Sequence, residues 1–274
     1  MSLDINMILQ KEKLQKVHQI LNDETRKFVI IDGVIGAGKT TTIKEIEKRI
    51  NKLNDMNIED KNYNQIKIKA IYEPVDNWKS TGALEYFYKD IPKNAYTFQT
   101  FTYITRIASV IDEIYNCPDA NIYILERSIW TDRYIFMELL KDLITDLELT
   151  MYYQWCDMWA YIMPMRVDKW VLLNTSLDES LKRINIRNRD GETSGISIEY
   201  QTNLYKKHIE FYSKLKDDGK SVVVLESSIM DENFIDNDDK IDNIIETILD
   251  IDMNKLKNIK NEQNGIFNWL LNMF

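Results

Sequence analysis

The segment with the most specific chemistry is Gly33–Thr40, whose sequence GVIGAGKT has the spacing G-x-x-x-x-G-K-[ST]. Its glycines let backbone N–H groups turn toward an anion, and a helix that begins here adds the positive end of its dipole. We expect Lys39 to bridge the outer phosphates of a nucleoside triphosphate and the Thr40 hydroxyl to hold Mg²⁺. The predicted phosphate-binding residues are Gly33, Gly36, Ala37, Gly38, Lys39, Thr40 and Thr41.

The phosphate loop does not show which molecule accepts the phosphate. The rest of the sequence argues against one class of protein, the small GTPases. A small GTPase needs an N-K-x-D base reader after a later strand. The segment that most resembles it is Asn51–Asn54, which lies too early in the chain and lacks the Asp. Small GTPases are therefore disfavoured.

Acidic and basic residues follow two later apolar runs. Glu73 comes after the second run and is suited to take a proton from a hydroxyl acceptor, although a surface carboxylate at a strand end would look the same. Glu126 and Arg127 follow the third run. An acid at this position commonly supports Mg²⁺, so we expect Thr40 and Glu126 at the metal, with Arg127 paired to Glu73 or to a phosphate.

Arginine is scarce in this lysine-rich chain, and six of its nine arginines fall in two segments. One segment holds Arg183, Arg187 and Arg189, with the first two on one helix face. Such a cluster can close as a lid over a transferring phosphate, whereas without a phosphate loop a solvated basic face would be the better interpretation.

The two histidines and the two cysteines are predicted to take no part in the chemistry. His18 and His208 lie in helical patterns far from any motif and are interpreted as helix-surface or boundary residues. Cys117 and Cys156 lie in apolar stretches without metal-ligand spacing and are interpreted as reduced core thiols.

Five short runs rich in Ile and Val must position these residues. They are Phe28–Ile31, Ile66–Tyr72, Ile122–Leu125, Trp170–Leu173 and Val222–Leu225. The second run alternates with lysine and is placed at a sheet edge, while the other four are expected to be buried on both faces of a parallel sheet. Strands that alternate with helical segments predict an α/β three-layer fold.

The rest of the chain is expected to form one compact domain with two extensions. Residues 3–21 carry the apolar periodicity of an amphipathic helix, and the expected units are an N-terminal extension 1–25, a main domain 26–250 and an apolar tail 251–274. The polar segments 54–65 and 231–240 are interpreted as solvated loops.

The amino-acid composition argues against some classes of binding partner. The 274 residues carry 44 acidic and 35 basic side chains, a net charge of −9, which argues against binding to nucleic acid or to an anionic membrane. No apolar run approaches the length of a membrane span, and the first 25 residues resemble neither a secretory nor a transit peptide. A cytoplasmic location is the expectation.

Taken in order, these motifs resemble the deoxyribonucleoside kinases, over roughly residues 26–250. The shared segments are Gly33–Thr40, Glu73–Val75 with Trp78, Tyr96–Gln99, Glu126–Ser128 continuing to Asp132–Tyr134, and the arginine lid. The resemblance implies a P-loop kinase fold with a five-stranded parallel sheet, ATP with Mg²⁺ as donor, transfer to the 5′-hydroxyl of a deoxynucleoside in nucleotide salvage, and a homodimer. The helix that contains Tyr152, Trp155 and Trp159 is apolar enough for an interface or for the core.

The resemblance also assigns roles to matching positions. It implies Glu73 as the base with Arg127 beside it, Trp78 and Phe98 packed on the nucleobase, Gln99 reading the base edge, Arg106 and Asp132 at the far end of the base pocket, and Tyr88 and Glu192 on the 3′-hydroxyl. Because Asp132 accepts hydrogen bonds, deoxycytidine and deoxyadenosine are expected to be preferred, with deoxyguanosine possible and thymidine poorest.

Two alternatives remain at this level. A nucleoside monophosphate kinase of the thymidylate kinase type shares the fold and the loop, but a carboxylate at Glu73 would oppose its acceptor phosphate. A non-catalytic relative should have lost the phosphate loop, the base or the lid, and all three are present in this chain.

Overall fold

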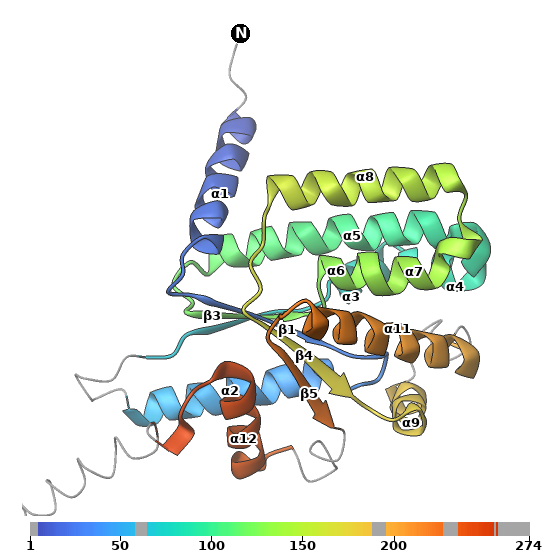
Figure 1. Cartoon of the computed structure of the whole chain (residues 1–274). Helices are drawn as coiled ribbons and strands as arrows, with labels where there is room; N and C mark the ends of the chain where they lie inside the picture. The colour runs from blue at the N-terminus through green and yellow to red at the C-terminus, as the bar shows by residue number, and fades with distance from the viewer. Residues whose placement is uncertain (1–4, 58–64, 188–195, 227–234, 255, 257–274) are drawn as a thin grey trace, which may run out of the picture.

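A five-stranded parallel sheet forms the centre of the protein, in the strand order β2-β3-β1-β4-β5 (Figure 1). The computed structural model describes residues 5–57, 65–187, 196–226, 235–254 and 256. The strands are β1 Lys27–Asp32, β2 Ile68–Ile71, β3 Ile122–Glu126, β4 Lys169–Asn174 and β5 Val222–Glu226. Because all the pairings are parallel, the carboxyl ends of the strands and the motifs that follow them meet at one edge.

Helices cover both faces of this sheet. Figure 1 shows α5, α7, α8 and α11 over one face and α2 and α12 against the other, which confirms the three-layer α/β fold. The helices are α1 Ile5–Leu21, α2 Lys39–Asn57, α3 Val75–Ser80, α4 Ala83–Lys89, α5 Ile91–Asn116, α6 Ile129–Thr131, α7 Met137–Leu140, α8 Asp146–Ile162, α9 Leu177–Arg187, α11 Ile198–Asp217 and α12 Asp238–Leu249, with a π-helical turn η1 Asp132–Phe136 and a 3-10 turn η2 Lys141–Leu143. Among the helices of these ranges, none combines the length and the apolar character needed to cross a bilayer.

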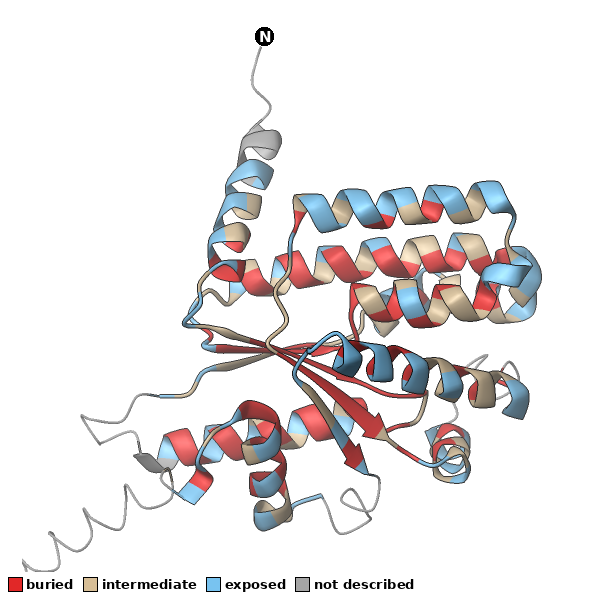
Figure 2. Cartoon of the chain, viewed as in Figure 1, coloured by how far each residue is buried: buried red, intermediate tan, exposed pale blue. Residues whose placement is uncertain are grey.

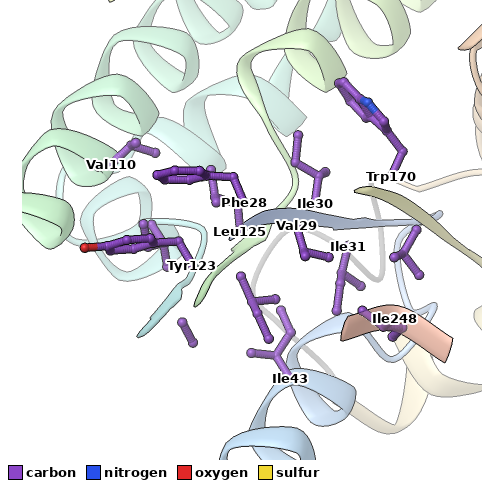
Figure 3. Close-up of a cluster of buried hydrophobic side chains, with 14 of the residues drawn as sticks. Phe28, Val29, Ile30, Ile31, Ile43, Val110, Tyr123, Leu125, Trp170 and Ile248 are labelled. Atoms are coloured by element: carbon purple, nitrogen blue, oxygen red, sulfur yellow. The ribbon is translucent and has the colours of Figure 1, made fainter. Parts of the chain in front are cut away.

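Strand β1 shows why its sequence is apolar without interruption. Phe28 and Ile30 point toward the α5 layer, whereas Val29 and Ile31 point toward α2 and α12 (Figure 3). These four side chains are fully buried, so each contributes about 1.5–3 kcal/mol of burial free energy. A strand that packs on both faces cannot alternate with polar residues.

The two edge strands of the sheet are β2 and β5, and the sequence predicted only the first of them. β2 lies at one edge, as its alternation with lysine predicted. β5 lies at the other edge, and Val224 is 47% exposed, so the prediction that Val222–Leu225 is buried on both faces is wrong. An edge strand lacks a neighbour on one side, and its branched residues reflect strand propensity more than burial.

The predicted N-terminal helix is present as α1 and packs against α5. Its residues Val17, Ile20 and Leu21 join the main core, which Figure 2 shows as buried positions on the strands and on the helix sides that face them. The apolar tail predicted from 251 lies outside the described residues from position 257 onward.

A helix end lies inside each of the two predicted polar segments, 54–65 and 231–240. α2 continues to Asn57. Within its last turn, the Asn54 side-chain amide donates to the Ile66 carbonyl at 2.7 Å and accepts from the Ile66 N–H at 3.2 Å. α12 begins at Asp238, since the side chain of Asn237 accepts the Lys240 N–H as an N-cap.

A buried ion pair joins the helix of the phosphate loop to the last long helix. Arg49 on α2 donates to both oxygens of Asp242 on α12, at 2.6 and 2.7 Å, and both side chains are buried. Lys52, one turn later, bonds the partly exposed Asp238 at 2.7 Å. Water cannot replace either partner of the buried Arg49–Asp242 pair, whereas it can solvate both side chains of the Lys52–Asp238 pair.

We predict that Arg49→Met lowers the free energy of unfolding by about 3–5 kcal/mol, since the buried Asp242 carboxylate would lose both hydrogen bonds and the charge of the Arg49 guanidinium. Lys52→Met on the same helix is the matched control and should cost less than about 1 kcal/mol. Urea unfolding followed by circular dichroism measures both. Equal losses in the two variants would show that burial of the Arg49 pair does not matter.

Candidate active site

A cavity of about 680 Å³ opens at the carboxyl ends of β1, β2 and β3. The phosphate loop, the segments after β2 and β3, and helices α4, α5, α9 and α11 contribute to its walls. Of the site residues predicted from sequence, all those that the structure describes line this cavity except Gly33. Arg189 and Glu192 lie outside the described residues.

The phosphate loop runs from the end of β1 into α2 and approaches α9 closely. Gly36 has φ +79°, and a Cβ atom there would lie 2.5 Å from the carbonyl oxygen of Ser180. A larger residue would collide with this backbone, so the glycine is required both by conformation and by space. The loop residues from Gly36 to Thr41 all line the cavity.

Lys39 is a buried cation inside the loop. Its Nζ donates to the carbonyl oxygens of Gly33 and Val34, at 3.3 and 3.1 Å. Burial, followed by the positive charge of Arg127, lowers the pKa of Lys39 to about 8, while nearby carboxylates including Glu73 oppose the shift. An anion bound in the loop would offset both unfavourable contributions.

Thr40 and Glu126 are adjacent, as the metal prediction requires. The Thr40 hydroxyl donates to Oε1 of Glu126 at 2.7 Å, and both residues line the cavity. A hydroxyl and a carboxylate are the oxygen ligands that Mg²⁺ accepts, with phosphate oxygens and water completing its shell. Within the described ranges, no group of three or more His, Cys, Asp or Glu residues forms a metal cage of its own, so these two residues fit an ion that arrives with a nucleotide.

Glu73 lies between two arginines. Oε1 accepts from Arg106 Nη2 at 2.9 Å and lies 3.2 Å from Arg127 Nε, whereas Oε2 has no hydrogen-bond partner among the described residues. Burial acts to raise the pKa of Glu73, but Arg127, Arg106 and Lys39 together lower it below its usual value. Glu73 is thus an ionised carboxylate with one oxygen available to the cavity.

Arg106 connects this carboxylate to a second one. It makes a two-bond pair with Asp132, Nε to Oδ2 at 2.7 Å and Nη2 to Oδ1 at 3.1 Å, and Nη1 donates to the Glu126 carbonyl at 3.3 Å. Burial raises the pKa of Asp132 and Arg106 opposes that shift, consistent with a carboxylate held by a planar guanidinium. Arg106 and Asp132 thus line the cavity and also form a buried ion pair between α5 and η1.

Aromatic rings and one amide complete the wall beyond Arg106. Trp78 is held by its Nε1 donating to Thr105 Oγ1 at 2.9 Å, and Phe98 stacks on Phe87 with ring centroids 4.3 Å apart. Gln99 is buried, and its Oε1 has no hydrogen-bond partner. A buried acceptor without a partner inside a cavity indicates that a ligand supplies the donor.

The predicted lid begins on α9. Arg183 and Arg187 line the cavity, and Arg183 bonds both Glu179, at 2.9 Å, and the Ala37 carbonyl of the phosphate loop, at 3.3 Å. Arg183 is therefore already in contact with the loop whose phosphates it was predicted to neutralise.

The prediction for His208 is wrong. His208 lies on α11 with 1% exposure, 3.2 Å from Asp32 and 3.3 Å from Arg127. A signal was present in the sequence, because Leu204, Phe211 and Leu215 place this position on the apolar face of the helix. His18 is half-buried near the Ile162 carbonyl, as a boundary residue should be.

The two cysteines also differ. Cys156 is buried as predicted, but Cys117 is only half-buried because it caps α5.

Several cavity residues were not predicted from sequence. Phe136 lies under the Arg127 guanidinium at 4.8 Å, brought there by the π-helical turn η1, and Tyr200 enters from α11. Phe136 belongs to the segment Asp132–Phe136, which the resemblance already included in part. Tyr200 carried no local signal, because it reaches the site only through the packing of α11 against the cavity.

Comparison with known proteins agrees with this geometry. The family model described as deoxynucleoside kinase matches residues 29–253. A "probable deoxycytidine kinase" of fowlpox virus (strain NVSL) is 33% identical over 229 residues, covering 83% of this chain and 88% of the relative. "Deoxycytidine kinase 2" of Gallus gallus is 27% identical over 66% of this chain and 71% of its own length, and "thymidine kinase 2, mitochondrial" of Macaca fascicularis is 25% identical over 70% and 66%.

The family match covers most of the chain, and the phosphate loop, the ionised carboxylate and the arginine helix meet in one cavity. The chain therefore belongs to the deoxynucleoside kinase family and is an ATP-dependent nucleoside kinase.

Proposed function

We propose that the protein transfers the γ-phosphate of ATP to the 5′-hydroxyl of a deoxynucleoside in nucleotide salvage, and that it prefers deoxycytidine, deoxyadenosine and deoxyguanosine to thymidine. The observation that carries the transfer is Glu73, whose Oε1 is held by two arginines while Oε2 is available to the cavity. A negative carboxylate at this place favours a neutral hydroxyl over an acceptor phosphate, which argues against a monophosphate kinase.

In the proposed reaction, Glu73 Oε2 accepts the proton of the 5′-hydroxyl. The 5′-oxygen forms a bond to the γ-phosphorus, while the bond between the γ-phosphorus and the β–γ bridging oxygen breaks and ADP leaves. Lys39 and the N–H groups of the loop bind the phosphates, and Arg183 and Arg187, with Arg189 from the undescribed segment, neutralise their charge. Thr40 and Glu126 would hold Mg²⁺, which neutralises charge on the β- and γ-phosphates when bound.

The remaining donor of Arg127 supports the same arrangement. Its Nε lies 3.2 Å from Glu73 Oε1 and its Nη1 donates to Asp32, whereas Nη2 has no hydrogen-bond partner among the described residues although Arg127 lines the cavity. We infer that Nη2 faces the reacting oxygens. Trp78 and Phe98 would pack on the base, and Tyr88 with Glu192 would hold the 3′-hydroxyl.

Glu73→Gln should lower kcat by about 10²–10⁴-fold with little change in nucleoside affinity, because an amide cannot accept the proton. Lys39→Ala is the contrasting variant and should weaken the use of ATP through lost phosphate contacts. The assay follows phosphate transfer to each of four deoxynucleosides and four deoxynucleoside monophosphates. Wild-type turnover in Glu73→Gln would refute the base assignment, and transfer to monophosphates alone would refute the acceptor class.

The proposed base preference rests on acceptors at the inner end of the cavity. Gln99 presents an unpartnered oxygen, and Asp132 is a carboxylate held by Arg106. Acceptors favour the exocyclic amine of cytosine or adenine, and Arg106 could donate to the carbonyl of guanine. Thymine presents a carbonyl and a methyl group to the same wall, where the Asp132 carboxylate disfavours the carbonyl and the Arg106–Asp132 pair occupies the space that the methyl group would need.

The double variant Arg106→Met with Asp132→Ala should raise kcat/KM for thymidine relative to deoxycytidine, by about tenfold or more. Removing both partners avoids leaving one buried charge alone, but Arg106 also holds Glu73, so absolute turnover should fall for every base. The relative values for all four deoxynucleosides are therefore the measurement. A wild-type enzyme that is best with thymidine would contradict the proposal.

We further infer a homodimer formed through α8. Tyr152 and Cys156 on this helix face the core, while its opposite side exposes an apolar stripe. The stripe consists of Leu147, Met151, Trp155, Met158 and Tyr161. Spacings of three and four residues place these side chains on one helix face, which suits the same helix of a second copy.

We also propose that residues 26–250 form the kinase domain, with 1–25 and 251–274 as its extensions. In this proposal the protein acts in the cytoplasm and binds neither nucleic acid nor a membrane.

Met151→Glu with Trp155→Glu should convert a dimer into a monomer in sedimentation equilibrium. Placing two charges in an apolar interface costs several kcal/mol, whereas in the monomer both side chains stay in water. Ile198→Glu, an exposed apolar residue on α11, is the control and should leave the mass unchanged. A wild-type chain that sediments as a monomer at micromolar concentration would rule out the interface.

A further inference from the structure

A buried polar cluster adjoins the phosphate loop and is centred on Asp32 at the end of β1, which is buried and does not line the cavity. Oδ1 of Asp32 accepts from the Gly33 N–H at 2.8 Å and from Arg127 Nη1 at 2.9 Å, and it lies 3.2 Å from His208 Nε2. Oδ2 accepts from the Thr131 hydroxyl at 2.6 Å. One carboxylate thus joins the phosphate loop, the segment after β3 and helix α11.

The bonds of His208 define what its ring can do. Nδ1 lies 2.8 Å from the carbonyl oxygen of Leu204, which can only accept, so Nδ1 carries a hydrogen. Nε2 then either accepts from Arg127 Nη1, 3.3 Å away, or carries a proton and donates to Asp32. In both forms the ring contacts the Asp32–Arg127 pair, and His208 itself does not line the cavity.

Arg127 needs such external support. Its backbone has φ +64°, a left-handed conformation that is unfavourable for a non-glycine residue, so only its surroundings can hold it there. The Arg127 N–H donates to the Ile31 carbonyl at 3.0 Å, and the guanidinium lies over Phe136. Because Nε and Nη1 are held by Glu73 and by the Asp32 cluster, the direction of Nη2 is determined by these contacts.

Helix α11 reaches the phosphate loop at a second point. Gln201, two turns before His208 on the same buried face, donates to the Ile35 carbonyl at 2.6 Å and lies 3.2 Å from the Ser180 hydroxyl. α11 therefore contacts the loop through Ile35 and through Asp32, which precedes its first glycine. The loop and Arg127 are both located relative to one rigid helix.

We propose that His208 is a positioning residue for phosphoryl transfer: with Asp32 it holds the Arg127 guanidinium in register with the phosphate loop, so that Nη2 points at the reacting oxygens. This inference rests on the proposed role of Arg127. A histidine that only filled the core would stabilise the fold without acting through Arg127, and the two cases differ in their coupling to that residue.

The test is a double-mutant cycle on kcat. His208→Leu should lower kcat by about 10–100-fold while the KM for the deoxynucleoside stays within about threefold, because the base and sugar contacts are elsewhere. In an Arg127→Met background, the same His208→Leu change should alter kcat by less than about threefold, since the residue it positions is gone. Leu215→Ala, a buried change two turns further along α11, is the stability control and should lower the melting temperature with kcat preserved.

A conservative replacement provides the second arm. His208→Gln places an amide near the position of Nε2 and can serve both Arg127 and Asp32, whereas His208→Asn reaches only the position of Nδ1. The glutamine variant should retain kcat at least about tenfold above the asparagine variant, at similar melting temperatures. This comparison also decides the matter if His208→Leu does not fold.

Three results would overturn the proposal: an unchanged kcat in His208→Leu, an equal loss in the wild-type and Arg127→Met backgrounds, or no difference between the glutamine and asparagine variants. If Arg127→Met alone keeps wild-type turnover, the proposed role of Arg127 fails instead. Loss of turnover in Arg127→Met together with a silent His208→Leu refutes only the inference about His208.

Discussion

The partly buried Glu73 carboxylate stays ionised because Arg106 and Arg127 lie against one of its oxygens. Removing a carboxylate from water is costly, and two adjacent guanidinium groups offset that cost. Each arginine in turn needs a second anion, Asp132 for Arg106 and Asp32 for Arg127. The charges of the cavity are therefore one connected network.

This network also explains the placement of the surrounding elements. Arg106 comes from the middle of α5, Asp132 from the π-helical turn η1, Asp32 from the end of β1 and Arg127 from the end of β3. The parallel sheet brings the strand ends together, and the irregular turn aims Asp132 back toward α5. Local strain at Arg127 persists because these partners determine where its side chain must lie.

The phosphate loop and the acceptor side are physically coupled through the same groups. Lys39 feels both the burial of its site and the charge of Arg127, and Asp32 bonds the first N–H of the loop as well as Arg127. Binding of a phosphate in the loop and of a hydroxyl at Glu73 would therefore act on one set of charges. Helix α11, through Gln201 and His208, supplies the rigid reference for both.

Much of this protein followed from the sequence alone, because the signals concerned are local. The phosphate loop depends on consecutive backbone geometry, the five strands on runs of apolar residues, and Glu73, Glu126 and Arg127 on their places directly after strands. Residues that reach the site from distant elements had no such signal. The burial of His208 against Asp32, the sharing of Arg106 between two carboxylates, the entry of Tyr200 and the exposure of Val224 all depend on which elements become neighbours. Apolar periodicity shows that a helix face is buried but not what it is buried against, so only the tertiary structure decided these pairings.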